Sequence, residues 1–154
     1  MSAFSLSLFL ASSAYAELPA NAKEGGSLTI LSNSAINSLN PAIQSGVATA
    51  MPGSQLFASL LTADDKWQFH PYLADSWEKS ADGLTYTFKL NKDAIFHDGK
   101  PVTSEDVAFS VMTVKENHPF GKSMYANLDK METPDPHTVV FKFLKPNPAL
   151  LLEV

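Results

Sequence analysis

Residues 84–90 constrain the fold most strongly, because their side chains alternate strictly between apolar and polar. The apolar ones fall on every second residue: Leu84, Tyr86, Phe88 and Leu90. A period of two is typical of a half-buried antiparallel strand. Asp82-Gly83 comes directly before this run, and glycine adopts positive φ without steric cost. The sequence therefore predicts a β-hairpin whose first strand is Ser76-Trp77-Glu78-Lys79.

A second glycine turn and a helix start follow this hairpin. We expect a short strand from Ala94 to His97, a turn at Asp98-Gly99, and a helix that has Thr103 as its N-cap. Asp106 stands three residues after Thr103, so the two side chains can satisfy free amides reciprocally. Apolar side chains recur at helical spacing on one face, with two more alongside: Val107, Val111 and Val114, then Phe109 and Met112. The helix should end near Asn117-His118-Pro119.

Three blocks in this region resemble the family 5 extracellular solute-binding proteins, the oligopeptide, dipeptide and nickel receptors of bacterial ABC importers. The blocks occur in order, and they are Leu73-Ala74-Asp75-Ser76-Trp77, Asp82-Gly83-Leu84-Thr85-Tyr86-Thr87-Phe88 and Phe96-His97-Asp98-Gly99-Lys100-Pro101-Val102-Thr103. The resemblance implies a mixed α/β fold, largely antiparallel hairpins plus helices, within a two-lobed periplasmic-binding-protein type II architecture. Members of that family are much longer than 154 residues. We therefore expect an incomplete fold in which residues 17–154 are the N-terminal portion of the solute-binding domain.

Residues 1–16 predict a secretory signal peptide. They contain no charged side chain, have an apolar stretch from Ala3 to Ala11, and finish in the small-x-small cleavage pattern Ala14-Tyr15-Ala16. The alternative is a short buried helix. Cleavage before Glu17 would place the mature protein in the periplasm.

Composition excludes several classes of function. The chain has no cysteine, which excludes disulfides, zinc–cysteine sites, a cysteine nucleophile and a lipidated cysteine anchor. A net charge of -5 and the absence of arginine argue against nucleic acid as a partner. Arginine is also the usual clamp for a carboxylate, so a peptide's carboxylate would need a lysine or a residue outside this sequence.

The remaining elements are predicted from turn residues and periodicity. We expect a strand over Ser27 to Leu31, a loop over Ser32 to Pro41, and a helix over Gly53 to Leu61 with Leu56, Phe57, Leu60 and Leu61 on one face. Two further hairpins should turn at Asp64-Asp65 and at Pro134-Asp135-Pro136-His137. Their strands are Trp67-Gln68-Phe69 for the first hairpin, and Leu128 to Thr133 with Thr138 to Leu144 for the second. Residues 147–154 begin an apolar helical segment.

Neither the histidines nor the aspartates form a pattern typical of catalysis. The four histidines, His70, His97, His118 and His137, are scattered without metal-ligand spacing, so we predict no metal site and no cofactor. Aspartates at predicted turns should bond to nearby main-chain amides: Asp64, Asp65, Asp82, Asp98 and Asp135. The larger aromatic side chains should belong to the core and the hairpins: Trp67, Trp77, Tyr72 and Tyr86. No nucleophile elbow, phosphate loop or dinucleotide fingerprint occurs, so we predict no enzyme.

The resemblance indicates where a ligand would bind. In peptide-binding members, the segment a few residues past the Asp/Asn-Pro element pairs through its main chain with an extended ligand. Here that segment is Ser45-Gly46-Val47, where Gly46 permits close approach of another backbone. An ordinary glycine loop is the alternative interpretation.

These observations favour a monomeric periplasmic receptor that captures a short peptide or similar solute and delivers it to an ABC permease complex in the inner membrane. Two other functions stay open: a periplasmic enzyme on an unrelated α/β fold, and a chaperone-like protein that uses the same fold without transport.

Overall fold

The computed structural model describes residues 25–27, 29–31 and 34–154. The chain divides into two units, residues 1–31 and 32–154. The described residues of the first unit form neither helix nor strand, so the prediction of a strand over Ser27 to Leu31 is wrong. A strand needs a partner for its main chain, and residues 25–27 and 29–31 belong to no described sheet. The predicted signal peptide, residues 1–16, lies outside the described residues.

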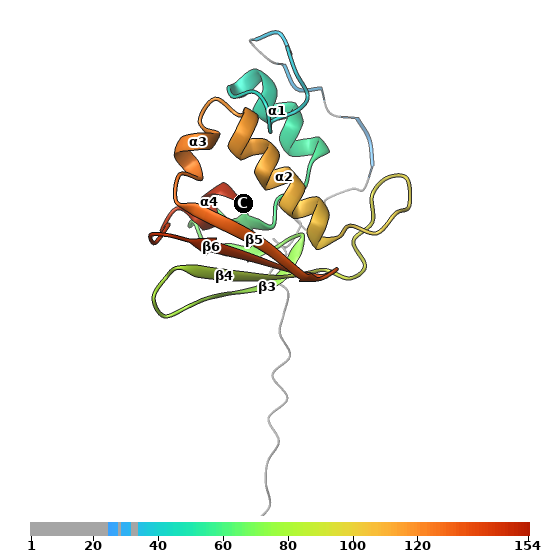
Figure 1. Ribbon diagram of the computed structural model, residues 1–154. Helices are drawn as coiled ribbons and strands as arrows, with labels where there is room; N and C mark the ends of the chain where they lie inside the picture. The colour runs from blue at the N-terminus through green and yellow to red at the C-terminus, as the bar shows by residue number, and fades with distance from the viewer. Residues whose placement is uncertain (1–24, 28, 32–33) are drawn as a thin grey trace, which may run out of the picture. The chain divides into compact units, whose positions relative to one another are not determined.

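A four-stranded antiparallel sheet dominates the second unit (Figure 1). It contains β3 (Ala74–Lys79), β4 (Thr85–Leu90), β5 (Leu128–Asp135) and β6 (Thr138–Phe143), in the order β3-β4-β6-β5. Both predicted hairpins of this sheet are confirmed, and Gly83 has the positive φ that its turn requires, 70°. β5 extends to Asp135, two residues further than expected, so Pro134 lies within an edge strand, where its missing N–H is tolerated.

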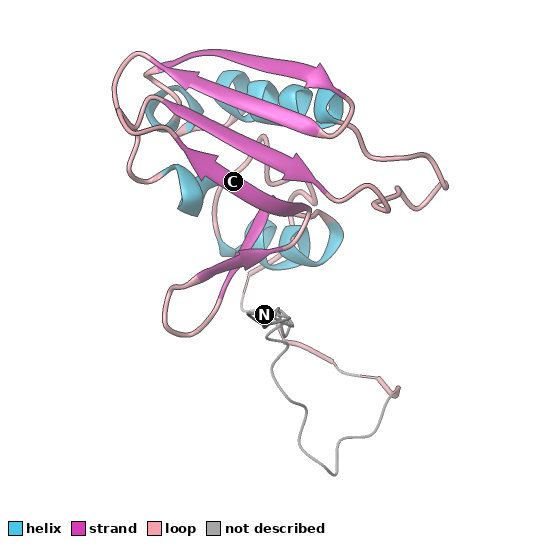
Figure 2. Cartoon of the chain, turned by 90° about the horizontal axis from the view of Figure 1, so that it is seen from below, coloured by secondary structure: helices cyan, strands magenta, loops and turns pink. Residues whose placement is uncertain are grey.

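The period-two pattern of β4 gives the sheet one buried face. Tyr86, Phe88 and Leu90 are buried, as are Val139, Phe141 and Phe143 on β6. Helix α2 (Ser104–Asn117) packs on this face against β5 and β6, and the helices lie behind the sheet in Figure 2. The opposite face is charged: Glu132 forms ion pairs with Lys130 at 2.7 Å and with Lys142 at 2.9 Å.

Helix α2 (Ser104–Asn117) begins and ends where the sequence predicts. The Thr103 hydroxyl accepts the Asp106 N–H at 3.4 Å, and the Asp106 carboxylate accepts the Thr103 N–H at 2.8 Å, so the capping box is confirmed. Val107 and Val111 are buried, whereas Phe109 is 74% exposed on the other side of the helix. The helix therefore presents one apolar stripe to the sheet and one large aromatic side chain to solvent.

Two buried tyrosines tie the end of the described chain to the core. The Tyr86 hydroxyl donates to the main-chain oxygen of Asn147 at 3.0 Å, just before α4 (Leu150–Glu153). Tyr125 follows the short helix α3 (Gly121–Met124), and its hydroxyl donates to the main-chain oxygen of Glu153 at 3.2 Å. Burial is the main cause that raises the pKa of Tyr125 well above its ordinary value.

The predicted helix over Gly53 to Leu61 is wrong. Helix α1 spans Val47–Leu56 and includes Pro52, while Leu60 and Leu61 are buried outside it. Gly53 lets α1 pass close to Pro41, since a Cβ atom at Gly53 would lie 3.0 Å from the proline ring. Leu61 instead begins the first strand of a two-stranded hairpin, β1 (Leu61–Ala63) and β2 (Phe69–Pro71).

The predicted strand from Ala94 to His97 is reduced to a single β-bridge between Ile95 and Pro101. The turn at Asp98-Gly99 is present, with φ of 85° at Gly99. The Phe96 N–H donates to the Lys100 carbonyl oxygen at 2.8 Å, so the chain reverses after too few residues for a ladder to continue.

Candidate functional site

Ser45, Gly46 and Val47 lie at the N-terminus of α1 and are all exposed. Gly46 is the N-cap residue and has a φ of 103°, and a Cβ atom placed on it would meet nothing within 4 Å. Ser45 and Gly46 form no strand, and Val47 is the first residue of the helix. The predicted ligand segment is therefore the exposed N-terminus of a helix instead of a strand edge.

The first turn of α1 leaves two main-chain donors available. The Thr49 and Ala50 N–H groups donate to the Gly46 carbonyl oxygen at 3.0 Å and 2.9 Å. Within the described part of the chain, the N–H groups of Val47 and Ala48 have no acceptor. No side chain caps the helix, and no acidic residue lies in its first turn. Free amides at the positive end of a helix attract carbonyl and carboxylate oxygens.

The aspartates predicted at turns bond to main-chain amides, with one exception. Asp64 accepts the N–H groups of Lys66 and Gln68, Asp82 that of Leu84, Asp98 that of Lys100, and Asp135 that of His137. Hydrogen bonds from side chains, first, and these main-chain bonds, second, lower the pKa of all four carboxyls. Asp65 has no such bond among the described residues. Each of these four carboxylates is bonded within its own turn, and the four do not come together as a catalytic group.

The histidines lie in different environments. His70 Nε2 is 3.0 Å from the Asp64 carboxylate, and His118 Nδ1 accepts the N–H of Phe120 at 3.2 Å. The Nδ1 atom of His137 is buried without a partner among the described residues. Over residues 25–27, 29–31 and 34–154, no three His, Cys, Asp or Glu side chains come together as a group that could hold a metal ion.

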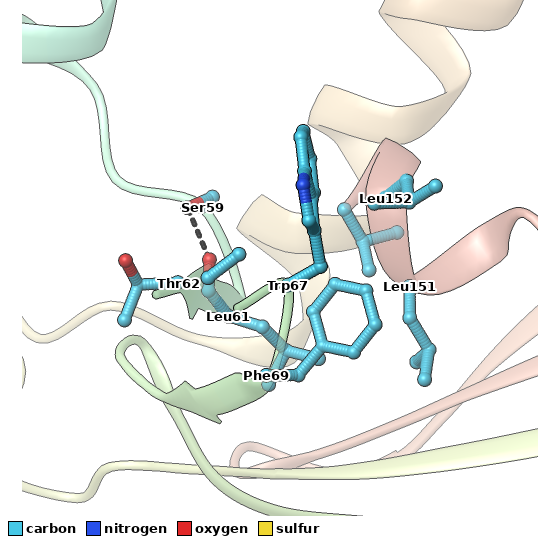
Figure 3. A pocket seen from close by; sticks show the side chains of 9 residues that line it. Ser59, Leu61, Thr62, Trp67, Phe69, Leu151 and Leu152 are labelled. Carbon is cyan, nitrogen blue, oxygen red and sulfur yellow. Dashed lines mark hydrogen bonds between the residues drawn. The ribbon is translucent and has the colours of Figure 1, made fainter. Parts of the chain in front are cut away.

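A pocket that sequence reasoning did not identify lies between the β1–β2 hairpin and α4 (Figure 3). Its volume is about 220 Å³, and its walls include Leu61, Trp67 and Phe69 on one side and Leu151 and Leu152 on the other. The prediction that Trp67 begins the return strand is wrong, because β2 begins at Phe69 and Trp67 lies in the turn before it. Trp67 is also 74% exposed and so is no core residue. Tyr72 is also exposed, at 58%, while Trp77 is half-buried and Tyr86 buried.

No signal in the sequence could have revealed this pocket, because it joins residues about ninety positions apart. In the part of the chain that the structure describes, no helix has the length and apolar character needed to span a membrane.

The fold described above is similar to that of proteins of known structure. Campylobacter jejuni NikZ in complex with Ni(L-His) superposes with a TM-score of 0.69 and 31% identity, over 77% of this chain and 24% of that one. Haemophilus influenzae OppA in complex with RPPGFSPFR gives a TM-score of 0.66 and 28% identity, over 72% of this chain and 25% of that one.

Residues 68–154 match the model of the bacterial extracellular solute-binding proteins, family 5, middle region. The match covers more than half of the chain, and the chain belongs to this family. The resemblance inferred from the three blocks and the fold class are therefore confirmed.

Proteins with similar sequences carry names that agree with this family. A putative ABC transporter peptide-binding protein of Brucella ovis is 41% identical over 99 residues, which is 62% of this chain and 18% of that protein. The periplasmic oligopeptide-binding protein OppA of Haemophilus influenzae is 38% identical over 73 residues, 47% of this chain and 14% of that protein. The chain thus spans less than one fifth of the length of these relatives.

Proposed function

We propose that this chain belongs to a periplasmic receptor that binds a short peptide or similar small solute for an ABC importer. The family match over residues 68–154 carries this proposal. Relatives named as peptide-binding proteins of ABC transporters and as a periplasmic oligopeptide-binding protein support it. The receptor acts as a monomer, delivers its solute to a permease complex in the inner membrane, and catalyses no reaction.

The N-terminus of α1 is the proposed ligand contact. An extended peptide placed against Ser45, Gly46 and Val47 would direct a carbonyl oxygen toward the free N–H groups of Val47 and Ala48. Gly46 would let the peptide backbone approach, because no side chain stands there and no atom lies within 4 Å of its missing Cβ. Main-chain contacts of this kind do not read side chains, which suits a receptor for peptides of varied sequence.

Calorimetric titration with di- to pentapeptides tests the function. The titration uses the whole protein that its gene encodes, purified after expression. Circular dichroism checks that this protein is folded. Saturable binding of several peptides, with a free amino acid as the control solute, is the expected result. A second experiment measures peptide uptake by a strain from which the gene has been deleted. The proposal would be contradicted if the folded protein bound no peptide and the deletion left peptide uptake unchanged.

Localisation has its own test. We propose export by the segment of residues 1–16, without lipidation, since the chain contains no cysteine. N-terminal sequencing of the periplasmic fraction should read Glu-Leu-Pro-Ala. A product that keeps Met1 and stays in the cytoplasm would contradict export.

A further inference from the structure

The segment before α1 folds into a turn that its own side chains hold. The Asn40 side-chain oxygen accepts the Ala42 N–H at 2.9 Å. The Ser38 hydroxyl accepts the Asn40 N–H at 3.1 Å, and the Ile43 N–H donates to the Asn40 carbonyl oxygen at 3.5 Å. An asparagine that bonds to the main chain two residues on stabilises a tight turn and so fixes the residue between the two partners. That residue is Pro41, whose own ring fixes φ.

The ring of Pro41 lies close to the main chain of α1. A Cβ atom placed on Gly53 would lie 3.0, 3.1 and 3.2 Å from the Cγ, Cδ and Cβ atoms of that ring. Gly53 and Thr49 are the buried residues of α1, and because they are four positions apart they lie on one face of the helix. The proline ring can approach this face because no side chain stands at Gly53.

The turn is thus connected to α1 at two places. Near the start of the helix, the chain passes from the turn into the N-cap residue Gly46, and further along, Gly53 lies against Pro41. Within residues 34–154, no other helix or strand packs extensively on α1. These two connections therefore set the direction of the helix axis. Because the free N–H groups of the first turn point along that axis, the turn also sets where they point.

We propose that Asn40 is a positioning residue for the peptide contact at the N-terminus of α1. Its side chain holds the turn, the turn holds the Pro41 ring against Gly53, and this contact aims the free amides at a carbonyl oxygen of the peptide. Asn40 acts through Pro41 and does not touch the peptide. The inference rests on the proposed function, because it requires that a peptide binds at these amides.

Calorimetric titration of the whole protein with alanine di- to pentapeptides tests the role of Asn40. Asn40→Ala should weaken binding about 3- to 10-fold, because misaligned amides lose much of a hydrogen bond. Asn40→Asp keeps an oxygen that can accept the Ala42 N–H, so its affinity should stay close to that of the wild type. Asn91→Ala is the matched control, because Asn91 makes the same bond with the Asp93 N–H, at 2.8 Å, in a turn after β4. It should leave peptide affinity unchanged.

A double-mutant cycle separates positioning from a general loss of structure. Val47→Pro removes one of the amides that the turn aims. If Asn40 acts by aiming these amides, Asn40→Ala should weaken binding by a clearly smaller factor in the Val47→Pro protein than in the wild type. Equal factors in the two proteins would overturn the proposal, because the loss would then be unrelated to this contact.

Gly53→Ala tests the contact between the helix and the proline ring while leaving the turn intact. The new Cβ atom would press on the ring of Pro41, so peptide binding should weaken. Pro41→Ala removes the two closest ring atoms, and in that protein Gly53→Ala should have a smaller effect on affinity. Gly53→Ala with the affinity of the wild type would show that the contact does not position the amides. This variant also decides the matter if Asn40→Ala does not fold, which circular dichroism detects.

Failure of this inference can be told from failure of the proposed function. If Val47→Pro weakens peptide binding and neither Asn40→Ala nor Gly53→Ala does, the peptide contact stands and the positioning role is wrong. If the folded wild type binds none of the peptides, or binds them no better than Val47→Pro does, the peptide contact itself is wrong and the role of Asn40 falls with it.

Discussion

The rings of Phe88 and Phe141 lie 5.4 Å apart, edge to face at 67°, on neighbouring strands of the sheet. Both side chains are fully buried, and Trp77 lies opposite Phe88 on β3. This contact joins the two hairpins that the sequence predicts separately, because β4 belongs to one and β6 to the other. Phe88, in the second of the three family blocks, therefore belongs to the core of the sheet.

Phe88→Ala should lower the free energy of unfolding by about 3–5 kcal/mol, since it removes a buried ring and leaves a cavity beside Phe141. Phe109→Ala is the matched control, because the Phe109 ring is 74% exposed. Its effect should stay within about 0.5 kcal/mol. Urea denaturation followed by circular dichroism measures both. A Phe88→Ala variant of unchanged stability would remove the claim that β4 is part of the core.

Gly121→Ala should destabilise the protein through a backbone clash. A Cβ atom at Gly121 would lie closer than 3.0 Å to the main-chain oxygens of Val114 and Lys115, at the end of α2. Main-chain atoms cannot give way as the tip of a flexible side chain does, so α3 would have to shift. Overpacking of this kind costs about 3 kcal/mol.

Gly99→Ala distinguishes this clash from the cost of glycine's backbone freedom. Gly99 has a φ of 85°, and a Cβ atom there would meet nothing within 4 Å. Its replacement should cost only about 1–2 kcal/mol, the penalty of a left-handed residue. Melting temperatures of the two variants compare the effects, and equal losses would argue against close packing of α3 on α2.

Asp64 should make the stability of the β1–β2 hairpin depend on pH. Its hydrogen bonds with His70, first, and with the Gln68 N–H lower the pKa of its carboxyl from 3.8 to about 2. Because the folded-state pKa is the lower one, the contribution of Asp64 is complete above the unfolded pKa and is lost as the pH falls from about 4 toward 2.

A comparison of wild type with Asp64→Asn tests this. The wild type should melt at a higher temperature at pH 5, and the difference should narrow as the pH falls from about 4 toward 2 and the Asp64 carboxyl takes up its proton. Asp65→Asn is the control, because the exposed Asp65 makes no hydrogen bond or ion pair within the described residues. A difference between wild type and Asp64→Asn that is constant over this range would show that the charge is not involved.

Local sequence patterns predicted those helices and strands that a few consecutive residues specify. The alternation in β4 and the Thr103–Asp106 capping box each specify one conformation, and both are confirmed. The apolar residues Leu56, Phe57, Leu60 and Leu61 fit a helix in sequence, but Leu61 begins a strand. There the pairing of Leu61 with Pro71 forms a strand instead, and no helical periodicity records that pairing.

The candidate sites were predictable to different degrees. The family resemblance predicted Ser45-Gly46-Val47 as the ligand segment. The structure adds that this segment is a helix N-terminus without a side-chain cap and with free main-chain amides. The Trp67 pocket could not be predicted, because neither the positive φ of Trp67 nor its proximity to Leu152 leaves a trace in the sequence.

Val47→Pro offers a selective test of the proposed ligand contact. Val47 is the first residue of α1, the helical position at which proline is best tolerated, because the N–H there has no partner within the helix. Gly46 has a ψ of 158°, within the extended range that a residue before proline prefers. The substitution should therefore preserve the fold and remove one donor.

If a peptide carbonyl oxygen accepts the Val47 N–H, Val47→Pro should weaken peptide binding by about 1–3 kcal/mol, or roughly 5- to 150-fold in affinity. Val47→Ala keeps the amide and should have little effect, since the Val47 side chain is 65% exposed. Calorimetry against di- to pentapeptides measures the affinities, and thermal melts of both variants control for misfolding. Equal affinities of wild type and Val47→Pro, with equal melting temperatures, would place the peptide contact elsewhere in the protein.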